Sequence, residues 1–391
     1  MHIDVLPTSS SMLDLAITNS ERELDTLRVA WSALLDTSAA DNVFLTWEWA
    51  SVWWRHYGKD NELHVIRITE EGELIGLVPL YARRFRRFGL AYTSLHLLGD
   101  GSWDSDYLDV IARSGDEETV VQALATFLTS REASHDILFL NEVPESSPGI
   151  QHIRRYAKRS AWYWNEVPVA CAYVELPADW DTFLKRLAPR MRTKIRSLTK
   201  ALEQEFSVRY ERCEREEDLP ARLDDLFRLH ALRWNEKQSQ GVFASTEKRQ
   251  FYREMAARFL ERGWLRLYSL LVDGRYVAHQ FCFEYKNRVF LLQEGFDPAW
   301  ETRGVGNVLR AHVFRECIAS GVSTYDFLAG VTPHKRSWGA AVKTTIRAST
   351  GHRTAKNMVF FVLPRLVDNG KQWVKALLPD RVLAWARSRA S

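Results

Sequence analysis

The chain has 391 residues, of which 46% are hydrophobic and 26% charged, and its net charge is +3. This length exceeds one ordinary hydrophobic core, so two domains are expected, and the composition is that of a globular protein in water. The small net charge argues against a general nucleic-acid-binding surface, and no DNA partner is expected. The four cysteines are scattered without C-x-x-C or metal-type spacing, so neither a disulfide framework nor a bound metal is expected.

The N-terminal segment MHIDVLPTSS has neither the basic region nor the apolar region of a signal peptide. No window approaches the run of about 18 apolar residues that a transmembrane helix needs. A cytoplasmic location is therefore expected.

The first half predicts helices followed by a mixed sheet. Apolar residues recur at helical spacing over 20–37, and TWEWASVWWRHYG predicts a short aromatic helix. A turn at Glu71-Gly72 separates two strand-like runs, which indicates a hairpin. The elements expected next are the strands YTSLHLL and DYLDVIA around the loop GDGSWDS, a helix over 116–131 and the strand DILFLNEV.

A basic amphipathic segment stands near the middle of the chain. After a predicted helix and the strand PVACAYVEL within 147–176, apolar residues recur every three or four positions over 181–205 and predict one long helix. Over 181–200 its other faces carry seven Lys and Arg residues against one acidic residue, Asp181. This face is either solvated or binds a phosphorylated acceptor, such as a nucleotide sugar, or a tRNA acceptor stem. The strand FSVRYERC, a helix from Pro220 through DLFRLHALRWNEK and a helix over 246–262 follow.

The segment 264–340 combines strands with a glycine-rich turn. The strands WLRLYSLLV, RYVAHQFCFEY and RVFLLQEGF precede a Gly-x-Gly turn and an amphipathic helix, and then come TYDFLAG and HKRSWGA. The same plan of hairpin, strand, loop, helix and strand occurs over 62–143. We therefore predict an α/β (α+β) fold of two similar lobes, each a mixed, mostly antiparallel sheet flanked by helices, with a cleft between the lobes.

The Gly-x-Gly turn is the candidate donor site. A glycine-rich turn at a helix N-terminus presents free N–H groups to an anion, and a strand edge can hold an extended ligand that contains amides. A pantetheine-linked donor, acetyl-CoA or another acyl-CoA, needs both features. The predicted cofactor-binding residues are Arg303, Gly304, Val305, Gly306 and Asn307. The competing interpretation is a plain turn with glycines for close packing.

Three residues are candidates for catalysis. His230, on an apolar helix face, is either a general base for an ammonium nucleophile or a hydrogen-bonded core residue. Glu294 ends the third strand of 264–296 and is a second candidate base. Lys335 belongs to the basic segment after the last strand, which either stabilises an oxyanion or is solvated.

A further set is predicted to contact the substrate. In the first half, a run of carboxylates follows the loop GDGSW and suits an ammonium group or sugar hydroxyls, although Gly and Asp also favour turns. The predicted substrate-binding residues are Trp234, Asp104, Asp106, Tyr107, Asp326, Arg336 and Trp338. Glu284 and Asp297 are additional carboxylates that suit either a base or a strand-end cap.

The C-terminal residues 356–391 mix Trp, Leu and Val with Lys and Arg. They form either a helix packed on the body or a peripheral contact with a membrane or an envelope-assembly partner. The domain boundaries expected from these patterns are 1–160, 161–350 and 351–391.

Several ordered segments resemble a known family. They are TWEWASVWWRHYG, GELIGLVPLYARR, LHLLGDGSWDSDYLDVI, LHALRWNEKQSQGVF, LLQEGFDPAW, GVGNVLRAHVF and YDFLAGVTPHKRSWGA. Together they resemble the tandem GNAT-type acyltransferases, namely the CelD/BioF2-like group, which is distantly related to the Fem peptidyltransferases. The resemblance implies two GNAT-like lobes and transfer of an acyl group from acyl-CoA to an amine of amino-sugar or amino-acid type. It also implies a place in exopolysaccharide or cell-envelope biosynthesis, and Lys335 resembles the lysine of Fem relatives near the reacting carbonyl.

The phosphate turn departs from the family pattern. The usual GNAT turn reads Q/R-x-x-G-x-G/A, whereas Glu301 stands at the leading position here and Arg303 lies two places on. Both glycines remain, so the backbone anion site is still expected, with weaker binding of CoA.

Two other functions compete with acyl-CoA-dependent transfer. A Fem-like peptidyltransferase that uses aminoacyl-tRNA would explain the basic helix, but peptidoglycan-type Fem ligases insert a long helical hairpin, whereas 181–205 is expected to be a single helix. A non-catalytic GNAT-like binding or assembly protein would explain the altered turn. The sequence contains no G-x-S-x-G motif, so a direct attack of the amine is expected rather than a covalent enzyme intermediate.

Overall fold

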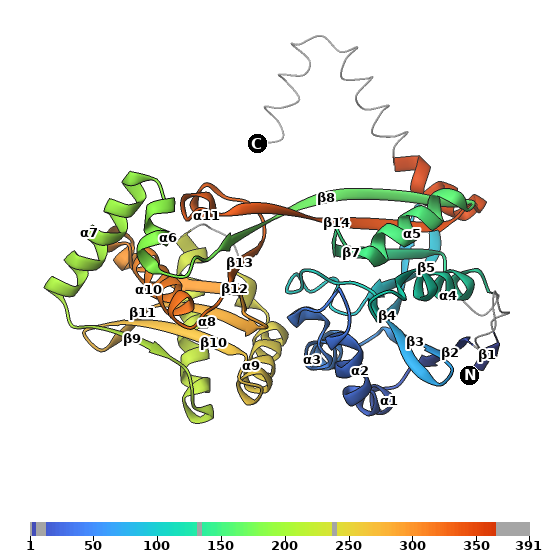
Figure 1. Ribbon diagram of the computed structural model, residues 1–391, viewed down its shortest axis with the longest axis horizontal. Helices are drawn as coiled ribbons and strands as arrows, with labels where there is room; N and C mark the ends of the chain where they lie inside the picture. Colours follow the sequence, from blue (N-terminus) through green and yellow to red (C-terminus); the bar gives the residue numbers. More distant parts are fainter. Residues whose placement is uncertain (1, 5–12, 131–134, 237–240, 365–391) are drawn as a thin grey trace, which may run out of the picture.

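The computed structural model describes residues 2–4, 13–130, 135–236 and 241–364, and it contains two lobes joined by two long strands (Figure 1). Side chains 234–236 are outside this description. In the described part of the chain, no helix has the length and apolar character needed to cross a bilayer.

The first lobe contains a sheet with helices on its faces. Its helices begin at side-chain caps where the sequence provides them: the Thr46 hydroxyl accepts from the N–H of Trp49, and Ser147 caps a helix whose first residue is Pro148. The helices are α1 (Glu21–Thr26), α2 (Arg28–Asp36), α3 (Trp47–Tyr57), α4 (Glu117–Thr129) and α5 (Pro148–Arg159). The strands are β1 (His2–Asp4), β2 (Leu13–Thr18), β3 (Glu62–Glu70), β4 (Glu73–Arg87), β5 (Leu90–Leu97), β6 (Ile111–Ala112) and β7 (Ile137–Pro144).

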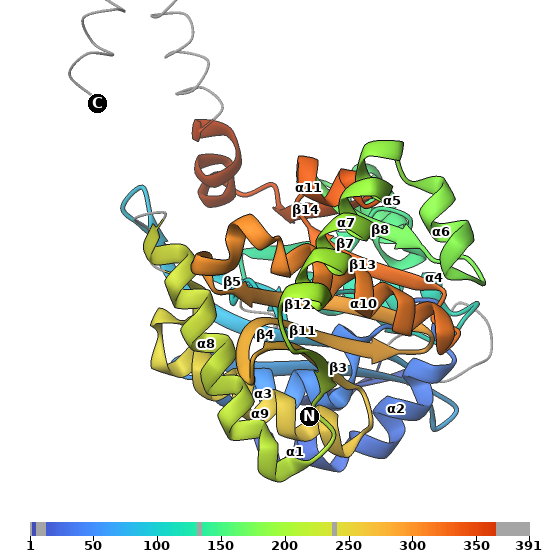
Figure 2. The same ribbon diagram turned by 90° about the vertical axis from the view of Figure 1, so that its left-hand side faces the viewer.

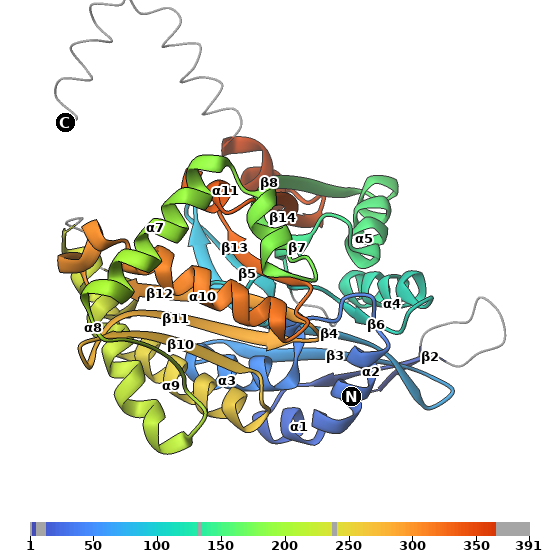
Figure 3. The same ribbon diagram turned by 60° about the vertical axis from the view of Figure 1, so that its left-hand side comes forward.

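The second lobe has the same kind of architecture. Its helices are α6 (Trp180–Arg186), α7 (Pro189–Glu205), α8 (Leu219–Glu236), α9 (Thr246–Glu261), α10 (Val305–Ala319) and α11 (Pro333–Ser337), and the 3₁₀ helix η4 (Pro298–Arg303) precedes α10. Its strands are β8 (Trp162–Glu175), β9 (Val208–Arg212), β10 (Leu265–Val272), β11 (Arg275–Tyr285), β12 (Arg288–Phe296), β13 (Thr324–Ala329) and β14 (Ala341–His352). Figure 3 shows α7 and α10 on one face of its sheet and α8 and α9 on the other.

The repeated plan predicted at 62–143 and 264–330 is present. In the first lobe β3, β4 and β5 pair antiparallel, and β7 then pairs parallel with β5 after the crossover helix α4. In the second lobe β10, β11 and β12 pair antiparallel, and β13 pairs parallel with β12 after α10. The predicted mixed, mostly antiparallel sheets flanked by helices are therefore confirmed.

The two lobes share one sheet, which the sequence patterns did not predict. The order is β1-β2-β3-β4-β5-β7-β14-β8-β13-β12-β11-β10-β9, with β6 beside β4. The strand β14 follows the second lobe in the chain but pairs with β7 of the first, while β8 pairs with β13 and with β14 along its length. This exchange of strands makes the lobes one continuous unit.

The expected single helix over 181–205 is wrong. It is divided into α6 and α7, because Pro189 has no N–H to continue a helix and holds Ala188 in an extended conformation with φ −56° and ψ 143°. Pro189 instead occupies the first turn of α7, where a missing N–H costs nothing.

The lobes also share a hydrophobic core. Trp49 of α3 is fully buried and its ring lies 5.6 Å from Phe251 of α9 and 5.9 Å from Phe283 of β11. Much of the predicted cleft is therefore filled by side chains. After β14, residues 355–364 are helical and pack on the first lobe, while 365–391 of the predicted tail lie outside the described residues.

Candidate active site

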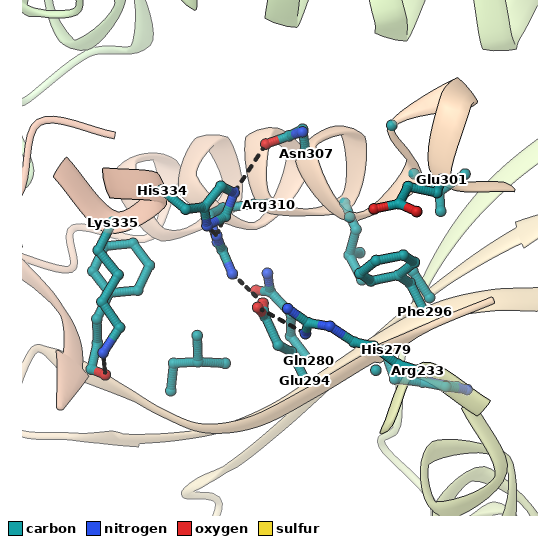
Figure 4. Close-up of a pocket in the computed structure, with 18 of the residues that line it drawn as sticks. Arg233, His279, Gln280, Glu294, Phe296, Glu301, Asn307, Arg310, His334 and Lys335 are labelled. Atoms are coloured by element: carbon teal, nitrogen blue, oxygen red, sulfur yellow. Dashed lines mark hydrogen bonds and ion pairs between the residues drawn. The ribbon is translucent and has the colours of Figure 1, made fainter. Parts of the chain in front are cut away.

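The main cavity opens where two parallel strands separate. Pairing between β12 and β13 is limited to Arg288–Phe290 and Thr324–Asp326, and beyond these residues the strands diverge. Within β12, Leu292 has no partner in β11, which is the signature of a β-bulge next to the opening. The cavity has a volume of about 600 Å³ and is bounded by the second-lobe sheet, the start of α10 and the segment around α11 (Figure 4).

The N-terminus of α10 faces this cavity. Gly304 has φ +63°, and a Cβ there would lie 2.6 Å from Leu198 of α7, so glycine is required at this turn. The backbone N–H of Asn307 donates to the carbonyl of Gly304, and no described side chain caps the helix. The backbone N–H groups of Val305 and Gly306 are therefore the open donors.

Four of the five predicted donor-binding residues line the cavity. They are Gly304, Val305, Gly306 and Asn307. Arg303 does not, because its guanidinium forms an ion pair with Glu205 of α7. Lys194 of the basic helix lines the cavity instead, and Glu301 also lines it.

Glu294 lies at the centre of the site between two arginines (Figure 4). Its carboxylate forms an ion pair with Arg310, and the guanidinium of Arg233 lies 3.5 Å away. Burial raises the pKa of Glu294, but Arg310 and Arg233 outweigh it and hold the pKa below its ordinary value. Glu294 is therefore an anionic positioning group and a weak proton acceptor.

His334 completes this network from α11. Arg310 donates to Nδ1 of His334 at 3.1 Å, and Nε2 of His334 lies 3.2 Å from the amide oxygen of Asn307. Desolvation and the neighbouring Arg310 lower the pKa of His334 to about 4, so the imidazole is neutral at pH 7. The network thus connects the anion site on α10 with Glu294.

A second cavity of about 290 Å³ lies between the lobes. The first lobe contributes Trp103, Asp104 and Asp106, and the second lobe contributes His230, Gln293 and neighbouring residues. Both cavities share the same wall, made of Arg233, Leu291, Glu294, Phe327 and Lys335. The two cavities therefore meet at Glu294 and its neighbours.

Asp106 is a buried carboxylate of the second cavity. It is 7% exposed, and its Oδ2 accepts from the N–H of Ala329 at 3.3 Å. Burial and the nearby charge of Glu142 raise its pKa to about 7, against the opposing effect of that hydrogen bond and of Lys335. A carboxylate with this pKa can bind an ammonium group and take a proton from it at neutral pH.

The other two predicted catalytic residues, His230 and Lys335, make structural contacts within the protein. His230 is buried, and burial and Arg233 lower its pKa to about 4. The backbone of His230 packs closely against Gly295 of β12. This contact requires glycine, because a Cβ at position 295 would lie 2.9 Å from the backbone N of His230. Lys335 donates to the carbonyls of Phe327, Ala329 and Gly330 at 2.7–2.8 Å, so its donors already fix the end of β13.

Three predicted substrate contacts connect the lobes instead. Both oxygens of Asp104 are occupied, by Lys248 and by the hydroxyl of Tyr252 at 2.9 Å. The hydroxyl of Tyr107 donates to Asp326 at 2.9 Å, and Lys343 of β14 pairs with Asp326 at 2.7 Å. Asp104 and Asp326 thus bind side chains from distant segments of the chain. Of the three carboxylates Asp104, Asp106 and Asp326, Asp106 is the one without a described side-chain cation bonded to it.

The remaining predicted contacts lie apart from the cavities. Trp338 is fully buried and packs 5.2 Å from Phe314, so it belongs to the core rather than to a substrate surface. Arg336 is exposed on α11 and lines neither cavity. The side chain of Trp234 is outside the described residues.

The sequence interpretation missed Arg310, Arg233 and Lys194. Arg310 is 1% exposed, and a buried arginine cannot be recognised from a helical pattern in which it replaces an apolar residue. Lys194 could not be distinguished in the sequence from the other six Lys and Arg residues of 181–200, so its place at the cavity was not predicted. In the described residues, no group of three or more His, Cys, Asp or Glu side chains is placed to hold a metal ion.

A known sequence family matches the part of the chain that lines the first cavity. The sequence family described as Acetyltransferase (GNAT) domain matches residues 189–336, which contain α7, the Gly-x-Gly turn and α10. This segment is therefore similar to GNAT-type acetyltransferase domains. A comparison with curated protein sequences found no match.

The fold of the whole chain is similar to solved structures at low sequence identity. The crystal structure of FemX has a TM-score of 0.61 at 9% identity, covering 90% of this chain and 100% of that one. A conserved protein of unknown function from Bacteroides thetaiotaomicron VPI-5482 has a TM-score of 0.53 at 12% identity, covering 86% and 100%. L-PGS from Bacillus licheniformis has a TM-score of 0.50 at 10% identity, covering 87% and 96%. These similarities concern the fold, and the narrower resemblance to the CelD/BioF2-like group stays a prediction.

Proposed function

We propose that this protein is an N-acyltransferase that transfers an acyl group from acyl-CoA, such as acetyl-CoA, to an amine. The observation that carries the proposal is the meeting of two cavities at one wall, with the uncapped N-terminus of α10 in the first and Asp106 in the second. Each reactant then has its own entrance, and direct transfer requires only that the two meet in the correct orientation.

The residues of the first cavity fit a pantetheine-linked pyrophosphate. The N–H groups of Val305 and Gly306 and the ammonium of Lys194 would hold the anion, while Glu301 opposes it. The matching helix of the first lobe, α4, has Glu117 and Glu118 in its first turn, which disfavours an anion there. We therefore place the donor in the second lobe alone. Bound there, the donor supplies a thioester carbonyl.

The residues of the second cavity fit a cationic acceptor. Asp106 binds the ammonium group and accepts one of its protons, so that the nitrogen becomes a neutral nucleophile at the shared wall. Glu294 and its two arginines keep this wall rigid. We propose an amino-sugar or amino-acid type of acceptor, in exopolysaccharide or cell-envelope biosynthesis, on the strength of Asp106 and of the resemblance to the CelD/BioF2-like group.

One observation favours a second candidate, an aminoacyl-tRNA-dependent peptidyltransferase. Apart from the half-buried Arg192, the basic side chains of α6 and α7 are exposed, and one of them, Lys194, lines the first cavity. A phosphate backbone could follow this surface to the same cavity. FemX has the fold that this chain resembles, but fold similarity does not decide the donor.

Thermal stabilisation by ligands distinguishes the two candidates. Acetyl-CoA, a longer acyl-CoA, a nucleotide sugar and tRNA are compared, because a ligand at 100 times its Kd stabilises the folded state by about 2.7 kcal/mol. We expect stabilisation by acyl-CoA, lost in Gly306→Trp. The backbone of Gly306 is unstrained, and a Cβ there would meet only the ring of Phe296 at 3.6 Å, so the new side chain fills the cavity without disturbing the turn.

Charge reversal on α7 supplies a matched pair of variants. Lys194→Glu should weaken acetyl-CoA binding roughly tenfold, since a charge-assisted contact to phosphate is lost. Lys200→Glu changes the same charge on the same helix but away from the cavity, and it should leave the affinity unchanged. Absence of stabilisation by any CoA would refute the proposal, and stabilisation by tRNA alone would establish the second candidate.

A further inference from the structure

Two neighbouring elements of the first lobe carry an unusual surface. The tip of the β4–β5 hairpin lies beside the helical residues 355–364, which appear in red in Figure 2. The ring of Phe360 lies 5.5 Å from that of Tyr92 and 6.1 Å from that of Phe85, and the Tyr92 hydroxyl donates to the carbonyl of Lys356. These contacts hold the two elements together as one surface, which we call the hairpin–helix surface.

The helical residues 355–364 are apolar on both faces. Phe360 and Phe361 are buried against the first lobe on the inner face. The outer face contains Ala355, Met358, Val359, Val362 and Leu363, of which Met358 is 50% and Leu363 37% exposed. A helix at the surface of a protein in water normally has a polar outer face, so this pattern indicates that a second apolar environment covers it.

The hairpin tip repeats the same combination of apolar and basic residues. Phe88 is 48% and Leu90 37% exposed at the turn, where Phe88 and Gly89 both have positive φ. The exposed arginines around them are Arg83, Arg84, Arg86 and Arg87, and Arg353 precedes the helical segment.

Among the described residues, few acidic groups neutralise these arginines. Arg84 pairs with Glu62 at 3.1 Å, and Asp136 is occupied by Lys356. The guanidinium of Arg87 lies 5.1 Å from the ring centre of Phe88 and 4.7 Å from that of Phe360. Cationic and apolar groups are therefore direct neighbours on this surface. The hairpin–helix surface is thus apolar at its exposed centre and positively charged around it.

We propose that the hairpin–helix surface docks the protein on an anionic membrane. Phe88, Leu90, Met358 and Leu363 would enter the boundary between headgroups and acyl chains, while the arginines bind lipid phosphates. The occupant is a membrane rather than a nucleic acid, because the exposed apolar side chains are mostly aliphatic and offer no stacking platform for bases. This proposal is independent of the acyl-transfer proposal, since it needs neither cavity.

Vesicle binding of the full chain tests the proposal. Sedimentation is measured with vesicles of phosphatidylcholine alone and of phosphatidylcholine mixed with phosphatidylglycerol. We expect binding to the anionic vesicles alone, weakened by salt. Each arginine near the surface contributes about fivefold in affinity, so Arg83→Gln with Arg86→Gln should lower the affinity about 25-fold. Phe88→Ser with Leu90→Ser should lower it roughly tenfold or more through lost apolar burial.

Controls separate docking from general adhesion. Val29 is 81% exposed on α2, a helix that Figure 1 shows well away from residues 355–364, so Val29→Ser should not change binding. The four native cysteines are buried, which allows a polarity-sensitive dye to be attached selectively to a Phe88→Cys or Val29→Cys variant. The dye at 88 should shift its emission to the blue on anionic vesicles, and the dye at 29 should not.

Several results would overturn the proposal. They are equal binding of the wild-type and arginine variants to anionic vesicles, no emission shift at position 88, and equal shifts at both positions. If tRNA rather than vesicles bound this surface, and the arginine variants abolished that binding, the surface would belong to a nucleic acid instead.

Discussion

Replacing Asp106 by Asn tests whether one buried carboxylate both costs stability and performs chemistry. The pKa of Asp106 is about 7 in the folded protein, against an ordinary value of 3.8. Between these two pH values the folded state binds a proton that the unfolded state has released. Stability therefore falls as the pH rises from about 4 to about 7, and the full cost is present above pH 7.

The magnitude follows from the two pKa values. The difference between 3.8 and about 7 corresponds to a free-energy cost of about 4 kcal/mol at most. Asn stays neutral at every pH and can still accept the hydrogen bond from Ala329. Asp106→Asn should therefore match the wild type at pH 4 and exceed its free energy of unfolding by up to about 4 kcal/mol at pH 8.

Asp109 offers a matched control for this experiment. It is 3% exposed, and burial raises its pKa to about 7 against the hydrogen bonds from Ser147 and from the N–H of Val110, but it lines neither of the two cavities that meet at Glu294. Asp109→Asn should gain stability at pH 8 in the same way. In urea unfolding at several pH values the two variants should behave alike.

Turnover then separates the two residues. With acetyl-CoA and a panel of amines, release of free thiol should rise in the wild type through pH 7, fall by two or more orders of magnitude in Asp106→Asn, and persist in Asp109→Asn. The reasoning is refuted if Asp106→Asn retains the wild-type pH profile of turnover. A wild-type pH profile of stability in Asp106→Asn would show that its pKa is not raised.

Two further predictions concern ion pairs inside the protein. Arg310→Met should lower the free energy of unfolding by about 3–5 kcal/mol, because it deprives Glu294 of its buried partner. Adding Glu294→Gln to this variant should restore part of the lost stability. Additive losses in a double-mutant cycle, measured by urea unfolding, would contradict this coupling. Lys343→Met should cost about 3 kcal/mol, because the Asp326 carboxylate is 2% exposed and keeps only neutral donors, while stabilisation by acetyl-CoA should be unchanged. Unaltered unfolding of Lys343→Met would show that this pair does not hold the lobes together.

The sequence predicted the local elements well, because helix and strand periods are local properties. The two repeated plans, the strands of the second lobe and the turn before α10 are where the patterns placed them, whereas only Ile111–Ala112 of the expected strand DYLDVIA is a strand. The break at Pro189 was also readable, since proline excludes a continuous helix, but the amphipathic period over 181–205 concealed it. The strand β14 was missed because its role depends on pairing with β7 and β8, which precede it by more than 150 residues.

The sequence by itself determined that residues 264–330 form strands and a glycine turn that opens a helix. Only the tertiary structure decided which polar residues remain available for chemistry. Asp104, Asp106 and Asp326 look alike in sequence, yet Lys248 occupies the first from 144 positions away and Tyr107 the third from 219. Asp106 lines the second cavity and, among the described residues, has no side-chain cation bonded to it. Partners from distant segments decide this, and local periodicity carries no information about them.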